Sequence, residues 1–269
     1  MKTLYVSDLD GTLLRSNERT SHFTNETVNA LVKKGVYFSY ATARSYNTAH
    51  KVTAGMTASF PLIIYNGAFI RDNATGEMLF KNFFDKAAVV ALIRDLTDHG
   101  IQPIVYSYVD GVEKFTFQME LLNKATKEFA LSREGDSRYR PVESFDELIA
   151  GDIFYITTID EVEKLAPFYE KYRDRYHCFY QRDIYSGEQW LEIVPKEVSK
   201  ANAILRLKEL LGCDRLVVFG DAINDLDMFQ VADEAYAVEN AVPELKEAAT
   251  AVIGSNDEDG VAKWLSRLL

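Results

Sequence analysis

Two aspartates near the start of the chain have a spacing that suits nucleophilic and acid–base chemistry. Asp8 and Asp10 lie in the segment Asp8-Leu9-Asp10-Gly11-Thr12, directly after the apolar run Leu4-Tyr5-Val6. A carboxylate can attack phosphorus and carry the phosphoryl group as an acyl phosphate, which divides one difficult displacement into two easier ones. A second carboxylate nearby can protonate the leaving oxygen and later deprotonate water. Taken alone, however, Asp10-Gly11 is also an ordinary turn signal.

Two further aspartates follow a later apolar run. Asp221 and Asp225 come after the segment Leu216-Val217-Val218-Phe219. If that segment forms a strand beside the first one, its aspartates converge with those near the start, and each ionised carboxylate raises the pKa of the others. A hard divalent cation compensates such a cluster, and Mg²⁺ suits a site of few carboxylates, waters and a substrate phosphate. We therefore predict a Mg²⁺ site formed by Asp8, Asp10, Asp221 and Asp225.

An anionic substrate also needs local positive charge, because the chain as a whole repels it. Lys and Arg number 30 against 41 Asp and Glu, which gives a net charge of -11. Lys200, at a predicted helix start, offers an ammonium group, and Thr42 offers a hydroxyl to a phosphoryl oxygen. Lys196, four residues before Lys200, is a rival for the same role. The net charge argues against nucleic acid or an anionic membrane as the main partner.

Alternating β-rich and helical patterns predict the elements that position these residues. Strands are expected at 4–6, 36–41, 62–65 and 216–219, with a helix whose N-cap is Thr24, a helix beginning near Ser45 and another from about Ser199 to Leu211. Strands separated by helices of this length indicate parallel crossovers in an α/β sheet. Ligands bind at the carboxyl ends of such strands, which is where the candidate residues lie.

The middle of the chain has a different pattern. Hairpin signals occur around 72–76 and at Asp110-Gly111, and strands and helices follow in runs typical of an α+β unit. We predict a Rossmann-like α/β core formed by residues 1–82 and 188–269, with an α+β cap domain inserted at 83–187. The aromatic residues of this middle part are interpreted as ordinary sheet packing and none is assigned to the site.

The rest of the sequence excludes several classes of protein. The N-terminus lacks the apolar region of a signal peptide, and no apolar run approaches the length of a membrane span. Cys178 and Cys213 lie far apart and have no metal-ligand spacing, and the four histidines are scattered. We expect a reduced, cytoplasmic protein without a zinc site, and the oligomeric state is left open.

In order and spacing these residues resemble the four motifs of the haloacid dehalogenase (HAD) superfamily. The match consists of the Asp8–Thr12 segment, Thr42 before Arg44, Lys200, and Gly220-Asp221 followed by Asn224-Asp225. The pattern is most similar to the Cof-type phosphatases (class IIB), which carry a large α/β cap between the second and third motifs. Asn66-Gly67-Ala68 and Asp259-Gly260-Val261 also match that branch. The resemblance covers both core segments, and the middle part only by position and size.

The resemblance implies a role for each matching residue. It makes Asp8 the nucleophile and Asp10 the general acid/base, with the backbone carbonyl of Asp10 also on Mg²⁺. Asp221 becomes a direct metal ligand, with Asn224 and Asp225 positioning the metal shell. The residues expected to bind substrate are Thr42, Arg44, Asn66, Lys200 and Asn224. Two positions depart from the family pattern, because Ala43 and Ala222 stand where glycine is usual.

Three functions remain open from the sequence. The leading prediction is a Mg²⁺-dependent phosphatase that hydrolyses a small phosphate monoester, such as a sugar phosphate, a nucleotide or a phosphorylated cofactor, through an aspartyl-phosphate on Asp8. The alternatives are a phosphotransferase or phosphomutase on the same fold and a non-catalytic protein that binds a phosphorylated metabolite. A non-catalytic copy would not need an intact set of Asp8, Asp10, Lys200 and Asp221, which disfavours that alternative.

Overall fold

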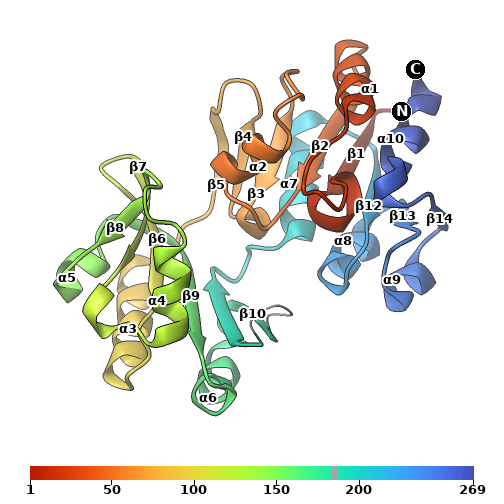
Figure 1. Ribbon diagram of the computed structural model, residues 1–269. Helices are drawn as coiled ribbons and strands as arrows, with labels where there is room; N and C mark the ends of the chain where they lie inside the picture. Colours follow the sequence, from red (N-terminus) through yellow and green to blue (C-terminus); the bar gives the residue numbers. More distant parts are fainter. Residues whose placement is uncertain (183–186) are drawn as a thin grey trace. The chain divides into compact units, whose positions relative to one another are not determined.

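The protein consists of two structural units. The computed structural model describes residues 1–182 and 187–269. Contacts divide these residues into a first unit, Met1–Lys81 with Val198–Leu269, and a second unit, Asn82–Glu197. The first unit therefore contains both ends of the chain, and the second is inserted into it (Figure 1).

An eight-stranded sheet forms the centre of the first unit, in the order β14-β13-β12-β1-β2-β3-β4-β5. Six of its strands run parallel, and only β4 and β5 join it antiparallel. The strands are β1 (Thr3–Asp8), β2 (Tyr37–Ala41), β3 (Pro61–Ile64), β4 (Phe69–Asp72), β5 (Met78–Lys81), β12 (Arg215–Gly220), β13 (Glu234–Val238) and β14 (Ala251–Ile253). The chain leaves β1 toward β2 on one side and returns as β12 on the other, so β1 stands at the topological switch point.

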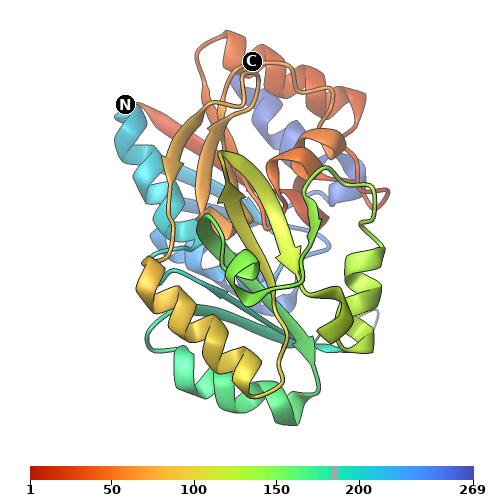
Figure 2. The same ribbon diagram turned by 90° about the vertical axis from the view of Figure 1, so that its left-hand side faces the viewer.

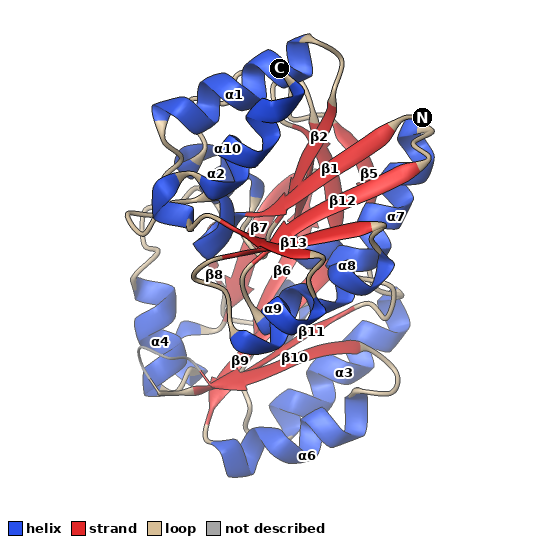
Figure 3. Ribbon diagram, turned by 90° about the vertical axis from the view of Figure 1, so that its right-hand side faces the viewer, coloured by secondary structure: helices blue, strands red, loops and turns tan. Residues whose placement is uncertain are grey.

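Helices cover both faces of this sheet (Figure 3). In the first unit they are α1 (His22–Lys33), α2 (Tyr46–Val52), α7 (Lys200–Leu211), α8 (Leu226–Val231), α9 (Pro243–Ala248) and α10 (Gly260–Leu265). On one side α1 contacts α10, and on the other α7 contacts α8. The central strands β1 and β12 are buried almost throughout, as their continuous apolar sequences indicate.

Local signals explain where the helices of the site begin and end. The side chain of Ser199 accepts a hydrogen bond from the Asn202 N–H, so α7 begins at Lys200, and Gly212 ends it in the left-handed conformation. Ser45 caps α2 in the same way. The predicted N-cap Thr24 is wrong, because the Ser21 hydroxyl accepts a hydrogen bond from the Thr24 N–H and α1 begins at His22.

A second, mostly antiparallel sheet forms the centre of the second unit, in the order β10-β11-β9-β6-β7-β8. Its strands are β6 (Ile104–Val109), β7 (Val112–Phe117), β8 (Tyr139–Pro141), β9 (Asp152–Asp160), β10 (His177–Arg182) and β11 (Gln189–Val194). Asp110 and Gly111 both have positive φ and form the two-residue turn between β6 and β7, as predicted. The predicted fold class, a parallel α/β core with an inserted α+β unit, is confirmed.

Each face of the second sheet has its own apolar cluster. The helices are α3 (Lys86–Asp98), α4 (Lys124–Leu131), α5 (Phe145–Leu148) and α6 (Val162–Tyr172). One cluster joins Val105 and Ile156 of the sheet to α3 and α6, which lie together over that face (Figure 2). The other joins Ile104, Phe115 and Phe117 to Ala130 of α4. Neighbouring residues such as Ile104 and Val105 thus enter different clusters because strand side chains alternate between faces.

The observed units correct one predicted boundary. The inserted part was expected to end at residue 187, but the second unit continues to Glu197. The reason is β11, which pairs antiparallel with both β9 and β10 and so belongs to the second sheet. Its alternating sequence resembles that of any half-buried strand, and nothing in it specifies the sheet that it joins. None of the helices described within 1–182 and 187–269 is long and apolar enough to cross a membrane.

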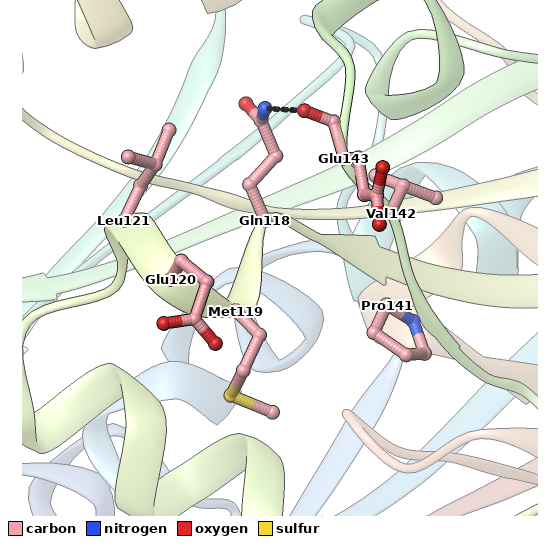
Figure 4. Close-up of a pocket in the computed structure, with 7 residues that line it drawn as sticks. All are labelled: Gln118, Met119, Glu120, Leu121, Pro141, Val142 and Glu143. Carbon is pink, nitrogen blue, oxygen red and sulfur yellow. Dashed lines mark hydrogen bonds between the residues drawn. The ribbon is translucent and has the colours of Figure 1, made fainter.

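The second unit also carries an open hollow of about 490 Å³ (Figure 4). It is lined by Gln118, Met119, Glu120, Leu121, Pro141, Val142 and Glu143. The Gln118 amide closes one side by donating a hydrogen bond of 2.9 Å to the Glu143 carbonyl. None of the predicted site residues lines this hollow, so the candidate site rests on the geometry of the first unit.

Candidate active site

Three neighbouring parallel strands deliver the predicted residues to one edge of the first sheet. Asp8 is the last residue of β1, Thr42 directly follows β2, and Asp221 directly follows β12. The registers pair Asp8 with Ala41 on one side and Ser7 with Phe219 on the other. The three strands therefore end at nearly the same level, which brings their carboxyl ends together as the sequence requires.

A single buried lysine joins two of the aspartates. Lys200 Nζ donates a hydrogen bond of 2.5 Å to Asp8 Oδ1 and one of 2.7 Å to Asp225 Oδ1. The Lys200 side chain is 3% exposed. Burial alone would lower the lysine pKa, but the carboxylates of Asp8 and Asp225 outweigh it and raise that pKa above its usual value. Lys200 therefore remains an ammonium group at the centre of the acidic cluster.

The rival lysine lies elsewhere. Lys196 belongs to the second unit, where its ammonium donates to the backbone carbonyls of Arg173 and Asp174. Of the two candidates, the structure brings only Lys200 to the aspartates.

Asp221 lies against the cluster from β12 and is partly buried. Its Oδ1 accepts a hydrogen bond of 2.6 Å from the Thr12 hydroxyl. Burial raises the pKa of Asp221 to about 6; the Thr12 hydrogen bond acts against this rise, and the neighbouring Asp225 carboxylate adds to it. Burial likewise raises the pKa of Asp8 well above its usual range, although the Lys200 ammonium opposes the shift. Negative charge in this cluster therefore exceeds what one lysine compensates.

This excess of charge makes the cluster suitable for a divalent cation. Among the residues that the structure describes, Asp8, Asp221 and Asp225 each offer a carboxylate oxygen, and these atoms lie within 4.8 Å of one another. Carboxylate oxygens are the ligands that hard cations such as Mg²⁺ prefer. The carboxylate of Asp10 is not part of this group. From the residues alone we expected Asp10 among four converging aspartates, whereas the family resemblance implies that its backbone carbonyl binds the metal.

Thr42 and Asn66 are held side by side by backbone hydrogen bonds. The Asn66 N–H donates to the Thr42 carbonyl at 2.9 Å, and the Thr42 N–H donates to the Ile63 carbonyl at 3.0 Å. Both side chains are buried. Asn66 has a left-handed backbone, with φ +53°, in the turn that follows β3. The Thr42 hydroxyl accepts the Arg44 N–H at 3.1 Å, which leaves its own hydrogen available as a donor.

Arg44 contacts Asp10 rather than the buried cluster. Its Nε lies 2.9 Å from Asp10 Oδ2 and its Nη2 lies 2.5 Å from Asp10 Oδ1. Nη2 also lies 3.2 Å from the Glu18 carboxylate. The hydrogen bonds to Asp10 raise the pKa of Arg44. Arg44 was predicted to bind substrate, whereas in the structure its guanidinium pairs with Asp10, the predicted acid/base.

Three predicted positions remain to be placed: Asn224, and the two alanines, Ala43 and Ala222, that stand where the family usually has glycine. Asn224 is exposed in the single turn Ile223–Asp225. Ala222 has φ -123° and ψ 168°, which is extended backbone, and the φ of Ala43 is not positive. Alanine therefore replaces the usual glycines at both positions without backbone strain.

Two other glycines are required by close packing in the site. A Cβ on Gly11, whose φ is +74°, would come within 2.4 Å of Asp221 Oδ2. A Cβ on Gly67 would come within 2.2 Å of the Ser199 carbonyl, immediately before Lys200. Gly11 thus permits Asp221 to approach the first strand, and Gly67 permits α7 to bring Lys200 to the cluster.

Sequence reasoning missed several supporting residues. Thr12 was recognised only as part of the aspartate motif, yet its hydroxyl donates a hydrogen bond to Asp221. The Asn240 amide donates a hydrogen bond of 2.8 Å to the Gly11 carbonyl and so holds the loop that follows Asp8. Glu18 completes the contacts of Arg44. Only Thr12 could have been found from the sequence, because it belongs to the aspartate motif. Asn240 and Glu18 lie in loops that contain no recognisable motif.

A match to a known family agrees with this fold and site. The chain belongs to the haloacid dehalogenase-like hydrolase family, whose model matches residues 5–265. The family predicted from the motifs is therefore confirmed, and with it the prediction that the chain is a hydrolase.

Individual relatives match along nearly the whole chain. The 5-amino-6-(5-phospho-D-ribitylamino)uracil phosphatase YwtE of Bacillus subtilis is 27% identical and the match covers 100% of this chain and 98% of the relative. The stress response protein YhaX of the same organism is 31% identical, with 97% and 91% covered. The crystal structure of TM0651 from Thermotoga maritima aligns with a TM-score of 0.80 at 29% identity, with 99% and 97% covered. The predicted phosphatase class agrees with the name of the first relative.

Proposed function

We propose that the chain is a Mg²⁺-dependent phosphatase that hydrolyses a small phosphate monoester through an aspartyl-phosphate on Asp8. The observation that carries the proposal is the position of Lys200, whose ammonium bridges Asp8 and Asp225 at 2.5 and 2.7 Å beside the third carboxylate, Asp221. A nucleophilic carboxylate, a cation-binding cluster and a fixed positive charge are the parts that phosphoryl transfer to an aspartate requires.

The phosphoryl group is held by residues around Asp8. The Thr42 hydroxyl and the Lys200 ammonium donate to its oxygens, and Asn66 and Asn224 are further proposed contacts. Asp8, Asp221, Asp225 and the Asp10 backbone carbonyl would hold Mg²⁺, which would supply positive charge to the phosphoryl oxygens. Each such contact strengthens as negative charge develops on those oxygens, and losing one costs about 10²–10³ in rate.

The reaction then proceeds in two displacements. A carboxylate oxygen of Asp8 attacks phosphorus, the bond from phosphorus to the ester oxygen breaks, and Asp10 protonates the departing alkoxide. Asp10 next takes a proton from a water molecule while the oxygen of that water attacks phosphorus. The bond between phosphorus and the Asp8 oxygen then breaks. Inorganic phosphate leaves, and both aspartates return to their starting states.

The proposed substrate is a phosphorylated metabolite of small size. In this proposal the second unit, Asn82–Glu197, is the cap that selects the substrate, and the relative YwtE is named for one phosphorylated metabolite. A panel of sugar phosphates, nucleotides and phosphorylated cofactors, compared by kcat/KM, would identify the class, since that ratio measures discrimination in the transition state.

Replacement of the nucleophile tests the proposal. Asp8→Asn should abolish Mg²⁺-dependent release of inorganic phosphate from p-nitrophenyl phosphate, because an amide is a poor nucleophile. Asp98→Asn is the matched control, since Asp98 is an exposed carboxylate at the end of α3. Release at the wild-type rate by Asp8→Asn would refute the assignment.

Product analysis separates hydrolysis from phosphoryl transfer to a sugar. Incubation with a hexose phosphate should lower the total ester phosphate as inorganic phosphate appears, whereas a mutase would conserve it. Acid-quenched protein should carry the phosphoryl group on the peptide that contains Asp8. Conserved ester phosphate would favour the phosphomutase instead.

A further inference from the structure

The contact between Arg44 and Asp10 has the geometry of a fixed fork. Arg44 Nε and Nη2 approach the two oxygens of Asp10 at 2.9 and 2.5 Å, so two parallel hydrogen bonds define both the position and the tilt of the carboxylate. The Asp10 side chain is 49% exposed, whereas that of Arg44 is 22% exposed. A half-exposed aspartate would otherwise sample several rotamers, so the arginine supplies most of its fixed geometry.

Arg44 is itself fixed by the backbone around it. Its N–H donates to the Thr42 hydroxyl at 3.1 Å, and its carbonyl accepts from the Tyr65 N–H at 3.0 Å. Ser45, the next residue, is the N-cap of α2. The segment that begins at Thr42 is thus joined to the ends of two strands and to a helix start, which makes it a rigid base for the guanidinium.

A third residue contacts the same guanidinium nitrogen that binds Asp10 Oδ1. Glu18 Oε2 lies 3.2 Å from Nη2 of Arg44, and the Glu18 N–H donates to the Arg15 carbonyl at 2.8 Å. Glu18 has φ +57°, an unfavourable region for a residue with a Cβ. The loop therefore keeps Glu18 in a conformation that directs its carboxylate to Arg44.

These contacts favour a role for Arg44 different from phosphate binding. Both guanidinium nitrogens that carry its described hydrogen bonds are turned to carboxylates, Asp10 and Glu18. The ammonium of Lys200, by contrast, is turned to the buried cluster. The two cations of the site thus serve different aspartates.

We propose that Arg44 is a positioning residue that holds the Asp10 carboxylate in the orientation for proton transfer, with Glu18 steadying the guanidinium. The inference rests on the proposed function, in which Asp10 protonates the leaving oxygen. It replaces the predicted substrate-binding role of Arg44. Proton transfer depends on heavy-atom distances of about 2.6–3.2 Å, so loss of orientation removes most of the contribution of Asp10, which is about 10²–10⁴ for a general acid.

The leaving group provides a readout that a purely structural role would not change. p-Nitrophenolate can leave without being protonated. Phenolate depends more strongly on protonation by a general acid, and the alkoxide that leaves from benzyl phosphate depends on it most. Arg44→Ala should lower kcat/KM by about 10²-fold for benzyl phosphate and much less for p-nitrophenyl phosphate. Arg44→Lys, which keeps one charged donor, should recover part of the loss. Arg19→Ala, an exposed arginine in the same loop as Glu18, is the control.

A double-mutant cycle decides whether Arg44 acts through Asp10. If it does, Arg44→Ala should add almost nothing to the loss caused by Asp10→Asn, because interacting residues are not additive. Urea unfolding of each variant checks that the protein remains folded, and Arg44→Gln replaces the alanine variant if that one does not. A full additional loss in the Asp10→Asn background, or an equal loss for all three esters, would overturn the proposal. Activity of Asp8→Asn would instead refute the proposed function itself.

Discussion

The ammonium of Lys200 and the carboxylate of Asp225 form a hydrogen-bonded ion pair of 2.7 Å in the interior of the first unit. The Asp225 side chain has no exposed surface, and its second oxygen accepts the N–H groups of Asp221 and Ala222 at 3.1 and 3.2 Å. Asp225 thus connects the lysine to the turn that carries Asp221. A Cβ on Gly220 would lie 2.8 Å from Asp225 Oδ2, so glycine at that position permits the carboxylate to fit there.

Removal of the lysine charge should destabilise the first unit. Lys200→Met leaves buried carboxylates without their cation, and breaking a buried pair from one side costs about 3–5 kcal/mol. The chain has two tryptophans, Trp190 in the second unit and Trp264 in the first. Urea unfolding followed by Trp264 fluorescence in a Trp190→Phe background therefore reports on the first unit.

The control for this measurement is Lys33→Met, an exposed lysine in the last turn of α1. It should change the free energy of unfolding by less than about 0.5 kcal/mol, as is usual for surface substitutions. A loss as small as that for Lys200→Met would show that the cluster does not depend on the ammonium group.

Mg²⁺ should stabilise the first unit through the same carboxylates. A ligand that binds only the folded state raises the free energy of unfolding by about 2.7 kcal/mol at one hundred times its Kd. Mg²⁺ titration with Trp264 as the probe should show this rise in the wild type and lose it on addition of EDTA. Asp221→Asn should remove most of the rise, whereas Asp98→Asn should retain it. An equal rise in both variants would place the cation elsewhere.

The edge of the sheet that carries the candidate site could be predicted from sequence because its determinants are local. Asp8, Thr42 and Asp221 each end or directly follow a continuous apolar strand, and parallel strands bring their carboxyl ends to one edge. The cap of α2 and the turn at Asp110-Gly111 were likewise predictable, since single side chains and positive φ decide them.

What the sequence could not specify depends on partners distant along the chain. Arg44 follows Thr42 closely, and nothing local indicates that its guanidinium contacts Asp10 and Glu18. The end of the second unit was wrong for a similar reason, because the pairing of β11 with β9 and β10 is a tertiary choice. The start of α1 was wrong because Ser21 and Thr24 are both acceptable caps; in the structure Ser21 is the cap, and the Thr24 hydroxyl donates to the distant Asp259 instead.

A methyl group at Gly11 should damage the site more than one at a similar glycine elsewhere. Gly11 and Gly35 have φ of +74° and +85°, so alanine costs backbone strain of about 1–2 kcal/mol at either position. At Gly35 nothing lies within 4 Å of the added Cβ, whereas at Gly11 Asp221 Oδ2 lies at 2.4 Å. Gly11→Ala should therefore displace Asp221 and remove Mg²⁺-dependent activity, while Gly35→Ala should lose stability only. Similar activity in the two variants would contradict this account.

In the second unit, a half-buried glutamate should make stability depend on pH. Glu192 of β11 lies opposite Thr157 of β9, whose hydroxyl is 3.5 Å from Glu192 Oε1. Burial raises the pKa of Glu192 from its usual 4.5 to about 7, and hydrogen bonds from Tyr155 and Thr157 only partly oppose the shift. Between these two pH values the folded protein therefore binds more protons at this residue than the unfolded chain does.

The free energy of unfolding of the second unit should accordingly fall as pH rises from about 4.5 to about 7, and this contribution should be constant above that range. Glu192→Gln cannot ionise, so it should match the wild type near pH 4 and exceed it in stability at pH 8. Urea unfolding followed by Trp190 fluorescence, in a Trp264→Phe background, measures the free energy of unfolding with and without Glu192→Gln. Glu134→Gln, an exposed glutamate in the same unit, should follow the wild-type curve at every pH. If Glu192→Gln retained the wild-type slope, the slope would arise from another group, because the glutamine side chain has no proton to lose in this range.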